Sequence, residues 1–161
     1  VVSDTHCYTW EELHPSIREC ISTADIAVHC GDFTRMDVVD GISKHSRKAV
    51  LVSGNSDPVE IREALPYTQI IEVQGISIGV IHPVWGGPEF PAEELLQDFT
   101  KQLDIVLFGH LHETLNEVRN GVLFVNPGQG YSSFKVPATM ATLTIQNGHA
   151  VADIILIEPG R

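Results

Sequence analysis

The sequence has few cysteines and no long hydrophobic run. Its three cysteines, Cys7, Cys20 and Cys30, form no C-x-x-C pair and are odd in number. This pattern argues against a disulfide scaffold and favours a reducing compartment, so we expect a cytoplasmic protein. No apolar stretch approaches the roughly 20 residues of a membrane-spanning helix, and no secretory signal is recognisable.

Basic residues are also scarce. The chain has 10 Lys and Arg residues against 21 Asp and Glu residues, a formal net charge of -11. A generic nucleic-acid binder needs a basic face for the phosphates, and an anionic membrane surface makes the same demand. We therefore expect neither partner. Bound divalent cations would invert the local field, so an acidic protein can still hold a small phosphate ester.

The remaining composition is that of an ordinary globular domain. Hydrophobic residues make up 43% and charged residues 19% of the 161 residues, which suits one compact domain over residues 1–161. No repeat, low-complexity tract or linker divides it. The chain opens abruptly on Val1-Val2, which read as the end of a strand, so we expect that strand to be clipped at its start.

Hydrophobic patterning predicts strands that alternate with helices at first and form antiparallel hairpins later. Asn120-Gly121 and Asn147-Gly148 are strong hairpin signals, and Gln74-Gly75 reads as a third such turn. The predicted helices begin at 15–20 and span 36–45 and 93–102, and the predicted strands are 26–28, 49–52, 69–73, 77–81, 104–108, 115–119, 122–125, 139–145 and 151–157. This order predicts an α/β (α+β) fold of two packed sheets covered by outer helices.

Seven residues with metal-ligating side chains fall just past the ends of apolar strands. They are Asp4, His6, Asp32, Asn55, His82, His110 and His112. In open α/β sheets, ligands bind at the carboxyl ends of the strands, where loops converge. Each motif alone has a common structural interpretation, because Gly-Asp and Gly-Asn are ordinary turn chemistry and a single buried His usually belongs to a core. The order and placement of the whole set indicate one metal site.

The donor types indicate which metals suit such a site. Carboxylate oxygens, imidazole nitrogens and one amide, without thiolate, suit Mn, Fe, Zn or Co, whereas structural zinc usually takes cysteines. A dinuclear centre with a bridging carboxylate needs about seven ligands, the number present here. The other histidines belong to none of these motifs and are expected to be structural or on the surface; they are His14, His29, His45 and His149.

The motifs D-x-H, G-D, G-N-x-D, H and G-H-x-H, in this order, resemble those of the calcineurin-like metallophosphoesterase superfamily, and within it the small stand-alone phosphodiesterases of archaea and bacteria. The similarity spans nearly the whole chain, including the later Asn126-Pro127-Gly128 turn. The resemblance implies a four-layer α/β/β/α sandwich of two mixed β-sheets. It also implies the ligand sets: Asp4, His6 and His112 for one ion, Asn55, His82 and His110 for the other, and Asp32 as the bridge.

The resemblance further implies a phosphoesterase with two divalent ions, Mn foremost, with Ni, Co, Fe, Zn or Mg as alternatives. Two ions about 3.5–4 Å apart lower the pKa of a bound water and polarise the phosphoryl oxygens. Our hypothesis is that a metal-bridging hydroxide attacks phosphorus, with Asp32, Asn55 and His110 as catalytic residues. The expected substrate is a phosphodiester rather than a phosphomonoester.

One departure from the family pattern concerns the leaving group. Many members have G-N-H-[DE], in which the His helps to protonate the leaving group, but this chain has Ser56, which cannot act as a general acid near pH 7. We therefore expect a preference for good leaving groups, or slow turnover. The following Asp57 is interpreted as a cap for the turn before Pro58.

A second departure follows His82. The family usually has H-G-H, whereas this chain continues as Pro83-Val84-Trp85-Gly86-Gly87. Trp85 is expected either to stack on an aryl group or nucleobase, or to pack against the sheet edge. The lost His residues keep an alternative function open, a non-catalytic scaffold of the same fold, as in the phosphoesterase-fold subunit of retromer. The exposed hairpins also allow a homodimer.

Overall fold

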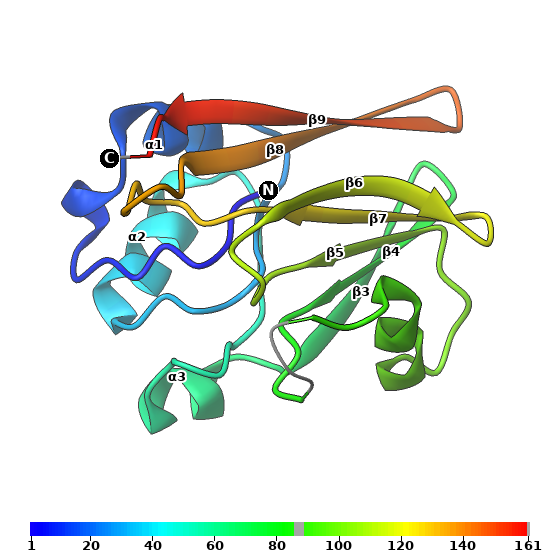
Figure 1. The fold of residues 1–161 in the computed structure, drawn as a ribbon, viewed down its shortest axis with the longest axis horizontal. Coiled ribbons are helices and arrows are strands. Elements are labelled where there is room, and N and C mark those ends of the chain that lie inside the picture. Colours follow the sequence, from blue (N-terminus) through cyan, green and yellow to red (C-terminus); the bar gives the residue numbers. More distant parts are fainter. Residues whose placement is uncertain (86–88, 161) are drawn as a thin grey trace.

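The computed structural model describes residues 1–85 and 89–160, and its larger sheet has five strands in the order β3-β4-β5-β7-β6 (Figure 1). These strands are β3 (Thr68–Val73), β4 (Ile76–Ile81), β5 (Ile105–Phe108), β6 (Thr114–Arg119) and β7 (Val122–Pro127). β4, β5 and β7 are parallel to one another, whereas β3 and β6 pair antiparallel with their neighbours. The sheet is therefore mixed, as the resemblance implied.

A second sheet layer consists of two strand pairs joined by the first residues of the chain. The pairs are β1 (Ala27–His29) with β2 (Ala49–Leu51), which are parallel, and β8 (Ala138–Gln146) with β9 (His149–Glu158), which are antiparallel. Val2 forms a parallel bridge with His29, and Val1 exchanges backbone hydrogen bonds with Ala141. Residues 1–2 thus place β1 and β8 on either side of one short strand, which continues directly into the D-x-H motif.

Helices cover the outer faces of the two sheets (Figure 1). They are α1 (Pro15–Thr23), α2 (Met36–His45), α3 (Val59–Ala64) and the 3-10 helices η1 (Trp10–Glu12) and η2 (Ala92–Asp98). Three apolar clusters hold the layers together: one contains Ile17 and Ile42 from α1 and α2, one lies between the sheets around Val80, and one packs Leu95 of η2 against Phe108. These clusters confirm the four-layer arrangement. No helix in the described part of the chain is long and apolar enough to cross a membrane.

The sequence signals for element ends are confirmed at several points. α1 begins at Pro15, and the His14 side chain accepts a hydrogen bond from the Ser16 amide at 3.2 Å, so this histidine is structural. All three hairpin turns have positive φ at both residues, 50° and 82° at Gln74-Gly75 and at Asn120-Gly121, and 53° and 75° at Asn147-Gly148. These values are those of type I′ turns, whose twist matches the flanking strands.

The predicted helix over 93–102 is wrong in type and length. The chain forms the 3-10 helix η2 over Ala92–Asp98, and Phe99 is already extended, with φ -116° and ψ 140°. Phe99 instead packs against Gly79 of β4, where a side chain would collide with it. Asp98 is also engaged, because its carboxylate accepts a hydrogen bond from the Trp85 indole at 2.6 Å. Tertiary packing therefore ends the helix earlier than its amphipathic pattern predicts.

Candidate metal centre

The seven residues predicted as ligands lie in loops that begin where strands end. Asp4 and His6 follow Val2, Asp32 follows β1, Asn55 follows β2, His82 follows β4, and His110 and His112 follow β5. Both sheets therefore contribute, because the first four residues come from the second sheet layer and the other three, all histidines, come from the five-stranded sheet. Contacts between side chains link all seven into one cluster.

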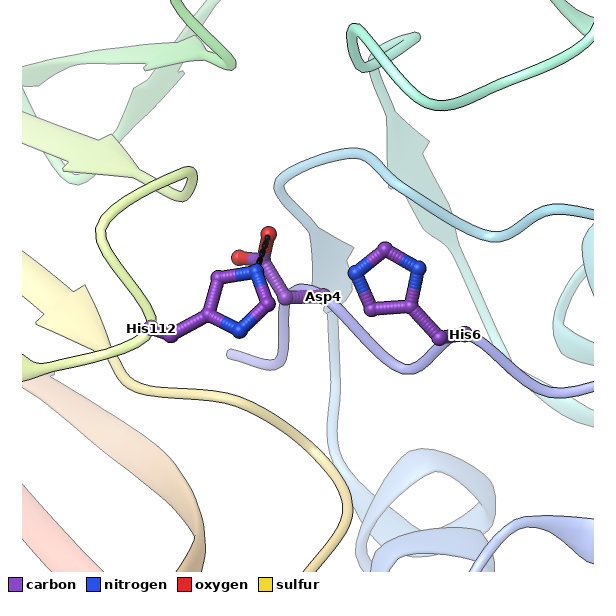
Figure 2. Close-up of side chains that lie close together, drawn as sticks. All are labelled: Asp4, His6 and His112. Carbon is purple, nitrogen blue, oxygen red and sulfur yellow. Dashed lines mark ion pairs between the residues drawn. The ribbon is translucent and has the colours of Figure 1, made fainter. Parts of the chain in front are cut away.

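A first group consists of Asp4, His6 and His112. Their ligand atoms all lie within 4.8 Å of one another. His112 Nε2 is 3.3 Å from Asp4 Oδ1, and Figure 2 shows Asp4 lying between the two imidazole rings, which reach it from different loops. Asp4 is fully buried, whereas both histidines are partly exposed. The carboxylate thus forms the floor of the group and the rings form its walls.

A second group consists of Asp4, Asp32 and His82, which are all buried and also lie within 4.8 Å of one another. Asp32 Oδ2 is 3.6 Å from His82 Nε2 and 3.7 Å from His6 Nε2. The Asp32 carboxylate therefore lies between a histidine of the first group and a histidine of the second. Asp4 belongs to both groups, although the resemblance assigned it to one ion.

Asn55 joins the remaining ligands at the mouth of the cluster. Its Oδ1 lies 2.9 Å from His82 Nε2 and 2.8 Å from His110 Nδ1. The backbone amide of His110 donates a hydrogen bond to Asp4 Oδ2 at 3.1 Å, which ties this side to the floor. Asn55, His82 and His110 thus meet at one point, and they are the set that the resemblance assigns to the second ion.

The backbone of the ligand loops is unusual. Five of the seven residues have left-handed φ values: Asp4 (49°), His6 (45°), Asp32 (61°), His110 (84°) and His112 (58°). This conformation is uncommon for residues other than glycine and is found where the surroundings enforce it, often at functional sites. The loops are therefore bent so that consecutive motif residues turn their side chains toward one centre.

Two motif glycines explain how closely the loops pack. A Cβ on Gly54 would collide with the Asp32 carboxylate, and a Cβ on Gly109 would collide with the Ser3 hydroxyl and approach Asp4 Oδ2 to 2.8 Å. The glycines of G-N and G-H-x-H are therefore required so that the backbone can pass directly against the two carboxylates.

Asp57 has a larger role than the cap that its position suggested. Its Oδ1 accepts from the amides of Phe33 and Thr34 at 2.7 and 2.8 Å, and its Oδ2 accepts from the amides of Gly54 and Asp32 at 2.7 and 3.1 Å. The carboxylate is 2% exposed, and its hydrogen bonds reach back to the loop after β1 rather than forward into α3. The capping interpretation is therefore wrong, because Asp57 joins the two loops that carry Asp32 and Asn55.

The charges of the cluster are mutually adjusted. Burial by itself would raise the pKa of Asp4, but the nearby imidazoles of His112 and His82 lower it overall. The adjacent Asp4 carboxylate raises the pKa of His112, whereas burial and the charge of His82 lower the pKa of His110. A cation that binds the first group must displace any proton on His112. Its binding therefore releases more protons at lower pH, where His112 is more fully protonated.

The donors fit divalent metal ions. Among the described side chains, Asp4 Oδ1 and His6 Nε2 are buried polar atoms without a hydrogen-bond partner, and both belong to the first group. Buried groups of this kind are normally satisfied, and a bound cation would satisfy these two. Cys7 and Cys30 are buried free thiols and belong to neither group, so the donors are oxygen and nitrogen.

The motif pattern missed Gln129, which lies at the centre, and it left two interpretations open for Trp85. Gln129 follows the Asn126-Pro127-Gly128 turn and lies 2.9 Å from His112 Nδ1, a contact that only the folded chain reveals. Trp85 packs on the outer apolar cluster beside Phe90, with ring centroids 5.3 Å apart, which supports the packing interpretation of this residue. Gly86 and Gly87, the end of the altered H-G-H region, lie outside the described residues.

Loops from two packed sheets that converge on paired carboxylates and histidines define a metal-binding α/β sandwich. The family model described as calcineurin-like phosphoesterase superfamily domain matches residues 1–148, so the chain belongs to this superfamily. A probable metallophosphoesterase of Methanocaldococcus jannaschii is 33% identical over 80% of this chain, and the chain spans 65% of that relative's length. A phosphodiesterase of the same organism is 24% identical over 80% of this chain and 81% of its own length.

Solved structures show the same architecture. The solution structure of a Thermotoga maritima protein is 27% identical, covers 97% of this chain and 98% of its own, and has a TM-score of 0.74. Vps29 of Chaetomium thermophilum also has a TM-score of 0.74 over 99% of this chain and 96% of its own, at 17% identity. At that identity, the likeness to Vps29 shows the fold alone.

Proposed function

We propose that this protein is a dinuclear metal-dependent phosphodiesterase. The observation that carries the proposal is the linked cluster of seven oxygen and nitrogen donors, in which Asp32 lies between His6 and His82. The first ion is assigned to Asp4, His6 and His112 and the second to Asn55, His82 and His110, with Mn as the preferred metal. When bound, such ions supply an activated water and polarise the phosphoryl oxygens.

The chain's own residues supply positioning rather than proton transfer to the leaving group. Asp32 is held by the Ser56 amide, which donates to its Oδ1 at 2.8 Å and leaves Oδ2 facing the histidines. The Ser56 hydroxyl accepts from Asn55 Nδ2 at 3.3 Å. Asn55 is exposed at the mouth, where its amide can turn to donate to a phosphoryl oxygen. Because no imidazole occupies position 56, substrates with good leaving groups are favoured.

The test is a metal-reconstitution assay. The protein is stripped with a chelator, restored with Mn, Ni, Co, Mg or Zn, and offered bis(p-nitrophenyl) phosphate and p-nitrophenyl phosphate. We expect metal-dependent turnover that is highest with Mn and faster on the diester. Metal content measured in the same samples is the control for occupancy.

A second candidate function is a non-catalytic scaffold of the same fold. Ser56 and Val84 favour it, since they stand where many family members have histidines. The same assay separates the two functions. Full metal occupancy without turnover on either ester would support the scaffold and reject the enzyme.

A further inference from the structure

Gln129 is a buried amide whose hydrogen-bonding groups are all engaged. The residue is 1% exposed. Its Nε2 donates to the Tyr131 carbonyl at 2.6 Å and to the Ser133 hydroxyl at 2.9 Å, and its Oε1 lies 2.9 Å from His112 Nδ1. Because the Tyr131 carbonyl can only accept, the NH2 group must face it, and Oε1 must face His112. The orientation of the amide is therefore determined by its neighbours.

This orientation determines which nitrogen of His112 carries the proton. An amide oxygen can only accept, so Nδ1 of His112 is the donor in this contact. Nε2 is then the nitrogen available to a metal, and it is the atom that faces Asp4 Oδ1 at 3.3 Å. Figure 2 shows one ring nitrogen of His112 joined to Asp4 and the other turned away from it.

The turn that carries Gln129 supports the other end of the same ligand loop. Asn126 Nδ2 donates to the Gly109 carbonyl at 3.2 Å, and Asn126 Oδ1 accepts from the Gly128 amide at 2.9 Å. The end of β7 and the residues that follow it thus hold the loop after β5 at two points, Gly109 before the first histidine and the ring of His112. Partners of this kind fix the tautomer and ring orientation of a ligand and tune its metal affinity.

We propose that Gln129 is a positioning residue that holds His112 in its Nδ1–H tautomer, with Nε2 directed at the first metal ion. The inference rests on the proposed dinuclear function and deepens it, because it assigns a metal-tuning role to a residue outside the seven ligands. A neutral amide serves this role without adding charge to a cluster that already contains two carboxylates. The Tyr131 and Ser133 contacts keep the amide from rotating.

The test compares three variants by calorimetric titration with Mn2+ after chelator treatment. Gln129→Met keeps the volume but removes the acceptor, and we expect it to weaken one of the two binding events by about 10–100-fold. Gln129→Glu restores an acceptor for His112 and loses the donors to Tyr131 and Ser133, so we expect it to recover metal binding. Gln69→Met is the matched control, since it loses a 2.7 Å hydrogen bond to the Leu51 carbonyl, and we expect wild-type affinity.

A spectroscopic readout keeps the inference testable if Gln129→Met does not fold. In Zn-loaded wild-type protein, long-range 1H–15N spectra should show the His112 proton on Nδ1. A proton on Nε2, or unchanged Mn2+ affinity in folded Gln129→Met, would overturn the role of Gln129 alone. If the wild-type protein takes up no metal, the dinuclear function fails as well, so the two failures are distinguishable.

Discussion

At the scale of single residues, Asp32 is the member of the cluster whose replacement should weaken metal binding most. Its Oδ2 lies 3.6 Å from His82 Nε2 and 3.7 Å from His6 Nε2, between the two predicted sets of ligands. We expect Asp32→Asn to weaken the binding of both ions, because it removes a charge that both would share. Loss of a mere supporting partner costs about 10–100-fold in metal affinity, and loss of a bridge should cost at least as much. Metal content and calorimetric titration measure the effect.

Asp25→Asn is the control for that prediction. Asp25 is exposed and forms a surface ion pair with Arg47 at 3.1 Å, so its charge change should leave both metal affinities unaltered. If Asp32→Asn retains one ion at wild-type affinity, Asp32 is a ligand of the other ion only. In that case Asp4, which belongs to both groups of close ligand atoms, becomes the better candidate for the bridge.

The sequence predicted residue types at this scale better than it predicted contacts. The sequence could predict that these seven residues lie together because each follows a strand, and strand ends on the same edge converge whatever the details of packing. Gln129 and Asp57 could not be found in this way. Their roles depend on hydrogen bonds to residues 17 and 25 positions away, and no local pattern encodes such partners.

At the scale of elements, Asp57 fastens the loop after β2 to the loop after β1. It is buried, and it accepts hydrogen bonds from four backbone amides, among them those of Asp32 and Gly54. We expect Asp57→Asn to lower the free energy of unfolding by roughly 2–4 kcal/mol, because the amide NH2 group would face backbone donors and leave them unsatisfied. Urea unfolding of the metal-free protein measures the change.

Asp153→Asn on the exposed face of β9 is the control for that change, and it should have little effect. The protein is unfolded without metal so that the stability lost with the Asp57 hydrogen bonds is not mixed with stability lost through weaker metal binding. Equal stability of Asp57→Asn and wild-type protein would mean that the two loops hold their shape without the carboxylate.

The element boundaries show where local patterning stops being sufficient. α2 was predicted over its observed span Met36–His45, because its apolar residues recur at helical spacing. In the structure its buried face meets η1 and the second sheet. The short elements η1 and α3 were not predicted, since one or two helical turns leave too little periodicity to detect. η2 was predicted as a longer helix, because its early end is enforced by the packing of Phe99 against Gly79.

At the scale of the whole molecule, the net charge of -11 and the buried carboxylates favour cation uptake, while one buried histidine limits stability in acid. His29 is fully buried at the end of β1, its Nδ1 accepts from the Gly31 amide at 3.2 Å, and its Nε2 lies 3.0 Å from the Thr5 hydroxyl. Burial lowers the pKa of His29 to about 3. The folded protein therefore keeps this imidazole neutral at pH values where the unfolded chain protonates it.

The sign of the effect follows from this difference. The unfolded chain binds a proton at His29 below about pH 6.5 and the folded protein does not, so stability is fully present above that pH and is lost as the pH falls toward 3. The expected slope is about 1.4 kcal/mol per pH unit. Since half of the unfolded chains are already protonated at pH 6.5, the free energy of unfolding should fall by about 1.6 kcal/mol more in the wild type than in His29→Asn between pH 6.5 and 5. Asparagine retains an acceptor for the Gly31 amide but cannot titrate.

Urea unfolding across this pH range, with chelator present so that metal release does not contribute, measures the slope. His149→Asn is the matched control, because His149 is exposed at the start of β9 and its replacement should leave the wild-type slope intact. Parallel loss of stability in His29→Asn and wild type would assign the acid sensitivity to the carboxylates of the metal centre instead. A shallower slope in His29→Asn would assign the acid sensitivity to His29 in the core, where its ring stacks on Phe33 with ring centroids 3.8 Å apart.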